Sequence, residues 1–227
     1  MIIFSSTSCV IGEGIEGNGN IVKKKFNITE SFTAITVSQG IEVILTQAEQ
    51  ASIEAEMDEN ILPLLVIVVD GKKLKISFKE NIRKRTKTIV YVSMPEITAL
   101  STSSGGDIES TNKFKVQDIT LKSSSGGEIE LNLSANSIDC NSSSGGDIEL
   151  KGECQTLDAE ASSGAKIDAE DLHSKIVTAN ASSGANIDVF ASESIDANSS
   201  SGADIDCYGN PSKQTISKSS SGSIDFK

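Results

Sequence analysis

Residues 142–149 read SSSGGDIE, and closely similar stretches recur throughout the second half of the chain. The isoleucine of each copy lies 18 to 21 residues after the preceding one. A period of about 19 residues is typical of solenoids in which each repeat forms one coil. The other copies are TSSGGDIE (102–109), SSSGGEIE (123–130), ASSGAKID (161–168), ASSGANID (181–188), SSSGADID (199–206) and SSSGSID (219–225).

Two short strands flank each copy of this phrase. After the glycines, apolar and polar residues alternate, as in Ile148-Glu149-Leu150, which is the period of a strand with one buried face. A second alternating segment starts 10 residues before the next repeat isoleucine, for example at Ile138, in five coils. The return from a repeat isoleucine to that segment takes 11, 9, 9, 10 and 8 residues. The pattern predicts an all-β, single-stranded parallel β-helix whose length variation lies opposite the phrase.

The phrase itself has the composition of a tight turn. Its first glycine, Gly145 in the copy at 142–149, occurs in all seven copies, whereas the next position holds Gly, Ala or Ser. We therefore expect one position of positive φ, which glycine adopts at little cost. The two residues before this glycine are Ser in every copy. Stacked coils would align them in columns about 4.8 Å apart, where we expect their hydroxyls to link successive coils.

Other segments, taken together with the repeats, resemble a known family. They are FTAITVSQGIEVILTQ (32–47), EAEMDENILPLL (54–65) and DGKKLKIS (70–77). The combination resembles the putative autotransporter adhesins with a head GIN domain, found mostly in Bacteroidetes. The resemblance implies a parallel β-helix similar in outline to pectin-lyase helices, and by that analogy right-handed, without their catalytic residues, and a role in adhesion. Where the family name implies Gly-Ile-Asn, this chain has Gly40-Ile41-Glu42, so no role of that Asn is carried over.

The first hundred residues are less regular. We expect a signal remnant and tether at 1–20, irregular β coils at 21–100 and regular repeats at 101–227, with 21–227 forming one continuous domain. Asp70-Gly71 predicts a hairpin turn. The segment KENIRKRTK (79–87) is a basic loop, interpreted either as a solvated hairpin end or as a docking site for an acidic surface or glycan. The strand candidates are 35–37, 41–46, 53–57, 64–69, 74–78 and 89–94.

The N-terminus, MIIFSSTSC, resembles the end of a bacterial lipoprotein signal, with Cys9 as the lipidated residue. Eight residues before that cysteine are too few for a complete signal, so either the signal starts upstream or the match is accidental. The resemblance implies a cell-envelope location, as an outer-membrane lipoprotein or a secreted or periplasmic protein. No other segment approaches about 18 consecutive apolar residues, so we expect no transmembrane helix.

Acidic residues are concentrated in the repeats. The chain has a net charge of −12, and residues 101–227 hold 9 Lys and Arg against 20 Asp and Glu. This balance argues against nucleic acid as a partner. One column of carboxylates directly follows the repeat isoleucines, and acidic residues in the outward position before them add to it, with Lys166 as the only relief. The column consists of Glu109, Glu130, Glu149, Asp168, Asp188, Asp206 and Asp225.

Two interpretations of this acidic column stay open. Carboxylate oxygens are ligands that calcium prefers, so the column is a candidate cation site. Alternatively, it is a screened, solvated surface that discourages edge-to-edge aggregation. The second is favoured because flat ladders of carboxylates lack the carbonyl-rich loops of strong calcium sites.

The sequence offers little for catalysis or for other cofactors. His173 is the single histidine, so a triad that needs histidine, or a site with several histidines, has one possible member at most. Cys140 and Cys207 lie at inward positions several coils apart, too far to bridge, and Cys154 lies in a variable return where exposure is conceivable. No cysteine spacing indicates a metal site, so we expect these three to be structural.

Three functional hypotheses follow. The leading one is a non-enzymatic cell-surface or periplasmic module that binds a glycan or an extracellular protein. A carbohydrate-active enzyme of the pectin-lyase-like type, using paired acids such as Asp147 and Glu149, is the alternative. A calcium-stabilised structural stalk is the third. Because the last coil ends without a capping helix, association with further copies of the chain is also expected to be feasible.

Overall fold

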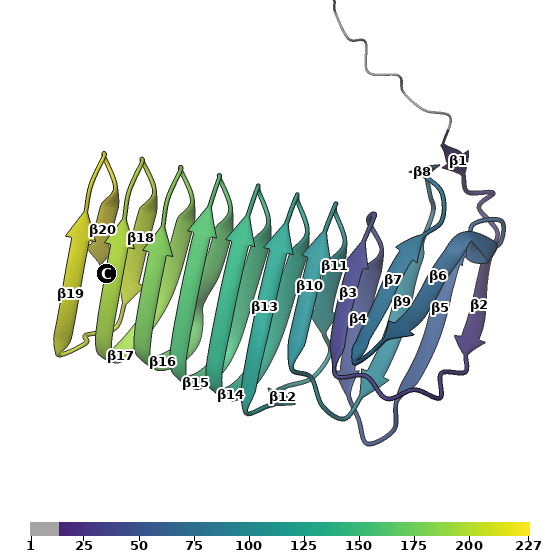
Figure 1. The fold of residues 1–227 in the computed structure, drawn as a ribbon, viewed down its shortest axis with the longest axis horizontal. Helices are drawn as coiled ribbons and strands as arrows, with labels where there is room; N and C mark the ends of the chain where they lie inside the picture. Colours follow the sequence, from purple (N-terminus) through teal and green to yellow (C-terminus); the bar gives the residue numbers. More distant parts are fainter. Residues whose placement is uncertain (1–13) are drawn as a thin grey trace, which may run out of the picture.

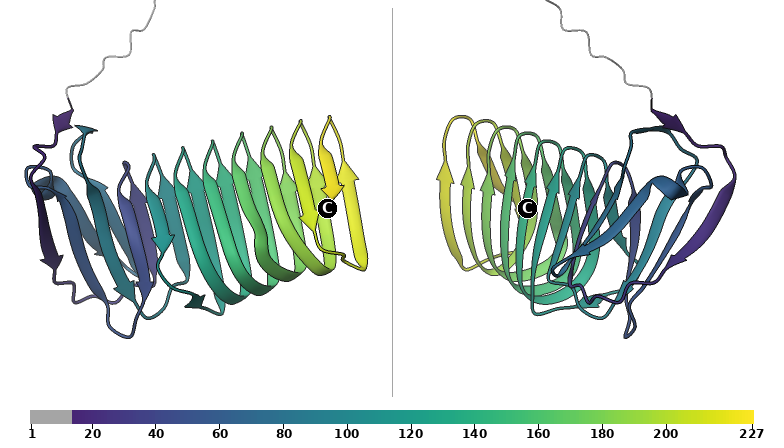
Figure 2. Two further views of the ribbon diagram at one scale, coloured as in Figure 1. Left: turned by 180° about the vertical axis from the view of Figure 1, so that it is seen from behind. Right: turned by 45° about the vertical axis from the view of Figure 1, so that its right-hand side comes forward.

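Nearly all of the protein that the structure describes consists of β-strands and the turns between them. The computed structural model describes residues 14–227. Within that part the strands stack into a long column, with an N-terminal head at one end (Figures 1 and 2). The head consists of residues 14–30 and 48–94. A short 3₁₀ helix, η1 (Leu62–Leu64), lies in the head. The all-β solenoid predicted from the repeats is confirmed.

The column has two faces, joined along one edge by tight turns and along the other by a smooth bend (Figure 2). The strands that precede the turns form sheet 1, and those that follow the turns form sheet 2. The long strands run through the bend and contribute to both sheets; they are β14 (Glu128–Ser143), β15 (Asp147–Ser162), β16 (Lys166–Ala181) and β17 (Asn186–Ser199). The other strands of sheet 1 are β7 (Lys73–Phe78), β3 (Ala34–Ser38), β10 (Ala99–Ser103), β13 (Asp118–Ser124) and β19 (Lys213–Lys218). The parallel partners in sheet 2 are β9 (Thr88–Met94), β4 (Glu42–Gln47), β11 (Asp107–Ser110), β18 (Asp204–Tyr208) and β20 (Ser223–Phe226).

The repeat isoleucines form one internal column, as their spacing predicts. Parallel pairing places each opposite the next, for example Ile129 opposite Ile148 and Ile148 opposite Ile167. All seven are at most 3% exposed. Register shifts occur near the bend, between Glu149 and Gly152 and between Ala169 and His173. The variation in coil length is therefore absorbed opposite the turns, where the sequence places it.

The turns differ from the prediction in their backbone. Two successive residues adopt positive φ, for example Ser144 at 52° and Gly145 at 70°. The expectation of glycine in every copy is wrong for the last turn, because Ser223 pairs with Asp204 and Ser221, with φ of 65°, takes the glycine position. Backbone groups, rather than serine hydroxyls, link the turns along this edge. The N–H of the turn glycine donates to the serine carbonyl of the next coil at 3.1–3.2 Å in the pairs Gly105–Ser125, Gly145–Ser163, Gly164–Ser183, Gly184–Ser201 and Gly202–Ser220.

An eighth turn of the same kind precedes the seven that the sequence shows. Gln39 and Gly40 have φ of 61° and 65°, and the Gly40 N–H donates to Ser104 O at 3.1 Å. The Gly-Ile-Glu segment thus belongs to the first regular turn. At this end no further coil donates to Gln39 O, and Arg85 Nη1 does so instead at 2.8 Å. The row of turns is therefore capped by a guanidinium.

The head combines an irregular coil, in which β7 and β9 continue the parallel stack onto β3 and β4, with antiparallel pairs that the sequence does not predict. β2 (Ile21–Phe26) pairs with β5 (Ser52–Asp58), and β5 pairs with β9, all antiparallel. β6 (Leu65–Asp70) forms an antiparallel hairpin with β7, which confirms the turn at Asp70-Gly71. All six predicted strand candidates of the first hundred residues are strands. Several of them, however, pair antiparallel with another strand instead of continuing the parallel stack. The coil of β3 and β4 lies between these head strands and the coil of β10 and β11.

The basic loop at 79–87 is tied to the head. Its strand β8 (Ile82–Lys84) pairs with β1 (Ile15–Glu16), and Arg83 forms an ion pair with Glu16. Lys87 Nζ lies 2.9 Å from Glu56 Oε2. Two of the five cationic side chains of this loop are thus paired with carboxylates within the head.

One buried carboxylate fixes the beginning of the described chain. Asp58 is fully buried, and it accepts hydrogen bonds from the backbone N–H groups of Gly19 at 2.7 Å and Thr86 at 2.9 Å. Burial acts to raise the pKa of Asp58, but the backbone donors of Thr86, Gly19 and Lys87 outweigh it and lower the pKa. This side chain is structural, because every contact it makes joins segments of the head.

Candidate functional site

The predicted acidic column exists as a continuous row on sheet 2. Parallel register places each carboxylate opposite the next, as for Glu130, Glu149 and Asp168. The same register holds from Glu109 through to Asp225. Like charges directly opposite one another are destabilising. The chain therefore needs a way to offset this repulsion.

Lysines interrupt the acidic row at three points. Lys151 Nζ lies 2.6 Å from Glu149 Oε1 and 3.8 Å from Glu130 Oε1. Lys166 Nζ lies 2.7 Å from Asp168, and Lys227 Nζ lies 3.2 Å from Asp206. Lys166 is thus not the only relief, because Lys151 and Lys227 approach the row from neighbouring positions.

Some carboxylates on this face are nevertheless harder to ionise than usual. Burial, followed by the charge of Asp168, raises the pKa of Asp188. Burial, and then Asp107 and Asp147, raise the pKa of Glu128. Within residues 14–227, no three Asp, Glu, His or Cys side chains lie close enough to hold a metal ion. The row thus has the geometry of a charged surface, and calcium binding stays a prediction.

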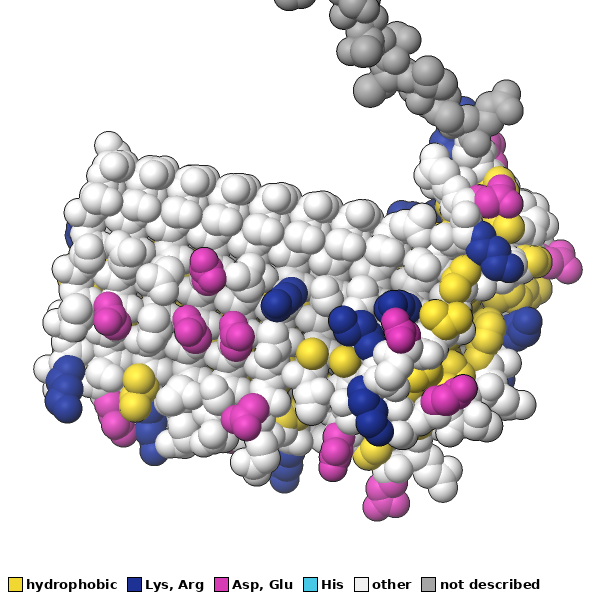
Figure 3. Space-filling model, viewed as in Figure 1, with side chains coloured by type: hydrophobic (Ala, Val, Ile, Leu, Met, Phe, Trp, Pro, Cys, Tyr) yellow, Lys and Arg dark blue, Asp and Glu magenta, His cyan; other side chains and the backbone are white. Residues whose placement is uncertain are grey.

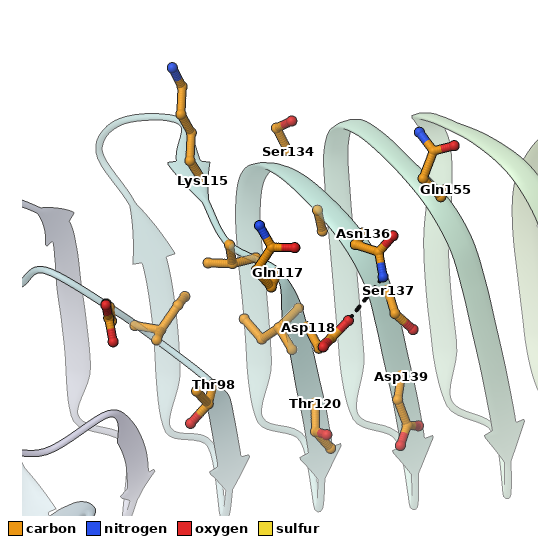
Figure 4. Close-up of a pocket in the computed structure, with 15 residues that line it drawn as sticks. Thr98, Lys115, Gln117, Asp118, Thr120, Ser134, Asn136, Ser137, Asp139 and Gln155 are labelled. Carbon is orange, nitrogen blue, oxygen red and sulfur yellow. Dashed lines mark hydrogen bonds between the residues drawn. The ribbon is translucent and has the colours of Figure 1, made fainter.

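A second candidate site lies elsewhere, in a hollow at the bends of the first repeat coils (Figure 4). It is an open groove of about 960 Å³. Three chain segments form it: the connection at 96–98, the stretch at 115–120 and the bend of β14 at 134–139 with Gln155 beyond. The connection at 96–98 and residues 116–117 depart from the regular coils, whereas Asp118 already begins a strand in register with β14. The groove is therefore the place where the repetition of the surface is broken.

Two anchors hold the irregular stretch in place. Phe114, in the short strand β12 (Phe114–Lys115), is fully buried and pairs with Leu133. The side chain of Gln47 accepts a hydrogen bond from Lys115 N at 2.8 Å and donates to Lys115 O at 3.1 Å. The stretch is thereby fixed to β4 on one side and to β14 on the other.

Hydrogen-bonding side chains dominate the lining of the groove. Asp118 and Asp139 come from the adjacent strands β13 and β14, and Asn136 Nδ2 donates to Asp118 Oδ1 at 3.3 Å (Figure 4). Gln117 and Gln155 add primary amides. Ile97 and Ile119 lie buried beneath them. Amides and carboxylates over an apolar floor suit a ligand rich in hydroxyl or amino groups.

Sequence reasoning did not place this groove. The signal was present, because the return from Ile108 to Ile119 takes 11 residues, the longest of the five. His173 does not belong to the groove: it is exposed and stacks edge-on against Phe190, with 4.6 Å between ring centres. Cys140, Cys154 and Cys207 are all buried, so the exposure considered for Cys154 is not observed. Cys9 lies outside the described residues.

A family of known proteins matches this chain over most of its length. The family model described as "Putative auto-transporter adhesin, head GIN domain" matches residues 31–211. The chain belongs to this family. The match spans the first turn at Gln39-Gly40, the head from β5 onward, the groove and most of the regular coils. No curated protein matches the sequence. Among the described residues, no helix has the length and apolar character needed to cross a membrane.

Several solved structures share the fold of this family member. A putative adhesin from Bacteroides fragilis NCTC 9343 has 21% identity and a TM-score of 0.88, covering 94% of this chain and 100% of its own. A putative adhesin from Parabacteroides merdae ATCC 43184 has 18% identity and a TM-score of 0.77, with 95% and 100% covered. A protein from Parabacteroides distasonis ATCC 8503 described as a putative lipid binding protein has 22% identity and a TM-score of 0.74, with 95% and 100% covered. At these identities the likeness shows the fold.

Proposed function

We propose that this protein is a non-enzymatic, adhesin-like module of the cell envelope that binds an extracellular glycan in the groove at the bends of the first repeat coils. The observation that carries the proposal is the groove itself, because side chains from the 96–98 connection and the 115–117 stretch line a hollow of about 960 Å³. The carboxylates and amides in its lining favour a glycan over a lipid, although a related structure is described as a lipid binding protein. Family membership supports a surface location.

A lipid tether at Cys9 is part of the same proposal, because it would hold the module at the membrane surface. Residues 10–13 and the strand β1 follow it, so the tether would leave from the head, where the described chain begins (Figure 1). Radiolabelled palmitate incorporation into the full-length protein, compared with Cys9→Ala, tests this part. Equal labelling of both proteins would contradict it.

The hydrolase alternative now rests on a defined pair of residues. Asp118 and Asp139 are the carboxylates that line the groove on β13 and β14, whereas the acidic row on sheet 2 lies outside it. Turnover of an oligosaccharide that is abolished by Asp118→Asn would favour the enzyme. We expect binding without turnover.

The experiment is a glycan array probed with the wild-type protein and two variants. Asn136→Ala removes an amide from the groove, and Asn132→Ala removes a matched, exposed amide from the same strand outside it. We expect a defined subset of glycans to bind, with at least tenfold weaker binding for Asn136→Ala and no change for Asn132→Ala. Absence of binding to every glycan, or equal losses in both variants, would refute the proposed function.

A further inference from the structure

The groove carries an uneven set of charges. Glu96, Asp118 and Asp139 line it, against the one ammonium group of Lys115. The three carboxylates come from three different segments: the connection after β9, the start of β13 and the sheet 1 part of β14. A ligand lying in the groove therefore meets negative charge from both walls.

These carboxylates are weakly neutralised within the described chain. Asp139 makes no hydrogen bond or ion pair with any described residue, and Asp118 accepts only the bond from Asn136 at 3.3 Å, which is long for such a bond. The side chain of Lys115 extends away from both (Figure 4). Lys113 forms its ion pair with Glu153 at 2.9 Å instead. Lys122 lies on β13 opposite Asn141 and makes no ion pair with a described carboxylate. The groove thus retains its negative charge.

The surroundings strengthen the same sign of potential. In the register of sheet 1, Asp139 lies opposite Asp158, and carboxylates continue along the outer face of the coils (Figure 3). Burial, and then Asp139 and Glu160, raise the pKa of Asp158, so its neighbours already act on it as a field of negative charge. Screening at physiological salt acts beyond about 8 Å. A polyanion in the groove would be repelled, and a cation attracted, at shorter range.

From this placement we infer that the groove selects glycans that carry protonated amino groups, with Asp118 and Asp139 receiving the ammonium and the amides of Gln117, Asn136 and Gln155 contacting hydroxyls. This inference rests on the proposed function and adds the chemical class of the ligand. Acidic polysaccharides, the substrates that a pectin-lyase-like enzyme would need, are excluded by charge. Fully N-acetylated chains lack the cation and are expected to bind weakly.

The test compares three oligosaccharides of equal length by calorimetry: a glucosamine oligomer, its N-acetylated form and a galacturonate oligomer. We expect the wild-type protein to bind the glucosamine oligomer at least tenfold more tightly than the N-acetylated form, and to show no binding of the galacturonate. The double variant Asp118→Asn/Asp139→Asn should lose this preference. Asp196→Asn is the matched control, because Asp196 is exposed on the same face of sheet 1, outside the groove. Its affinity should stay within twofold of wild type.

Two further results separate the outcomes. If Asp196→Asn weakens binding as much as the double variant, the attraction comes from the acidic surface as a whole, and the inference is wrong. If a neutral or acidic glycan binds best and Asn136→Ala abolishes that binding, the proposed function stands and the charge selection falls. Circular dichroism of each variant confirms that it is folded.

Discussion

Ser142 presents a buried hydroxyl without a partner, and its removal should stabilise the protein. The residue lies in sheet 1 just before a turn, is 1% exposed, and its Oγ has no hydrogen-bond partner. In the same inward column, Ser123 donates to Gly127 O at 2.6 Å and Ser199 donates to Ala203 O at 2.6 Å. The next coil has Ala161 opposite Ser142, so alanine fits this column. Ser142→Ala is therefore the informative change.

The magnitude follows from the state of the hydroxyl. A buried polar group without a partner costs about 1–3 kcal/mol. Ser142→Ala removes that cost and one oxygen atom, and the adjacent Ala161 shows that a methyl group packs there. We expect a gain of about 1 kcal/mol in the free energy of unfolding, which raises Tm by about 2–4 °C in a chain of this size.

Ser123→Ala provides the control, because it also removes a buried serine hydroxyl, but one that forms hydrogen bonds. It removes the bond to Gly127 O and leaves Thr102 Oγ1, which donates to Ser123 Oγ at 3.0 Å, without its acceptor. Ser123→Ala should lower the free energy of unfolding by about 1–2 kcal/mol. Calorimetry and urea titration of both variants measure the difference. If Ser142→Ala lowers Tm as Ser123→Ala does, the Ser142 hydroxyl is bonded in solution and the reasoning is refuted.

Four other predictions follow from the coils. Ile148→Ala opens a cavity in the central column and should cost about 2–5 kcal/mol in urea titration; a loss below 1 kcal/mol would contradict its position in the core. Gly145→Val places a β-branched residue at φ of 70°, where no atom lies within 4 Å of the new Cβ, so any loss of Tm measures backbone strain alone and an unchanged Tm would contradict the turn geometry. Because burial and Asp168 raise the pKa of Asp188, ionisation of Asp188 destabilises the fold as pH rises above about 4; Asp188→Asn should raise Tm at pH 7 but not at pH 3, and equal gains at both would contradict this. Since no three Asp, Glu, His or Cys side chains of residues 14–227 lie close enough to form a metal site, we expect EDTA to leave Tm unchanged; a rise in Tm with millimolar calcium would instead support the stalk hypothesis.

The regular coils could be predicted from the sequence because the turn phrase and the alternating strands that flank it recur in coil after coil. A period of two around each isoleucine fixes which side chains point inward, and a constant distance of 10 residues across the turn fixes the register between the two faces. In the last turn the sequence alone assigns the glycine position to Gly222, because Gly222 follows two serines as the turn glycine does in the other copies. Only the pairing of Ser223 with Asp204 reveals that Ser221 has taken the glycine position. A hydroxyl side chain tolerates that conformation in the other turns as well, as Ser144 shows.

The head and the groove were less predictable, because they depend on contacts between segments that are distant in sequence. Strand positions in the head followed from local alternation, but their antiparallel pairing depends on which segments meet. The coil of β3 and β4 lies between the head strands and the repeats in space. In sequence, however, it precedes the repeats and most of the head strands. The groove needs Gln47, in β4, to hold Lys115, 68 residues later. No local sequence pattern predicts that contact.

Recognition in a solenoid requires a departure from its regularity. Identical coils present identical rows, as the acidic face does, and such rows offer the same chemistry at every step along the axis. A ligand that must bind in one place needs a position where the rows differ. In this chain that position is the first bend after the head, where an 11-residue return, the connection at 96–98 and the anchor at Phe114 interrupt the pattern. Under the proposed function, the long stack of coils beyond it is a negatively charged support that repels polyanions from the groove and leaves its amides and carboxylates accessible.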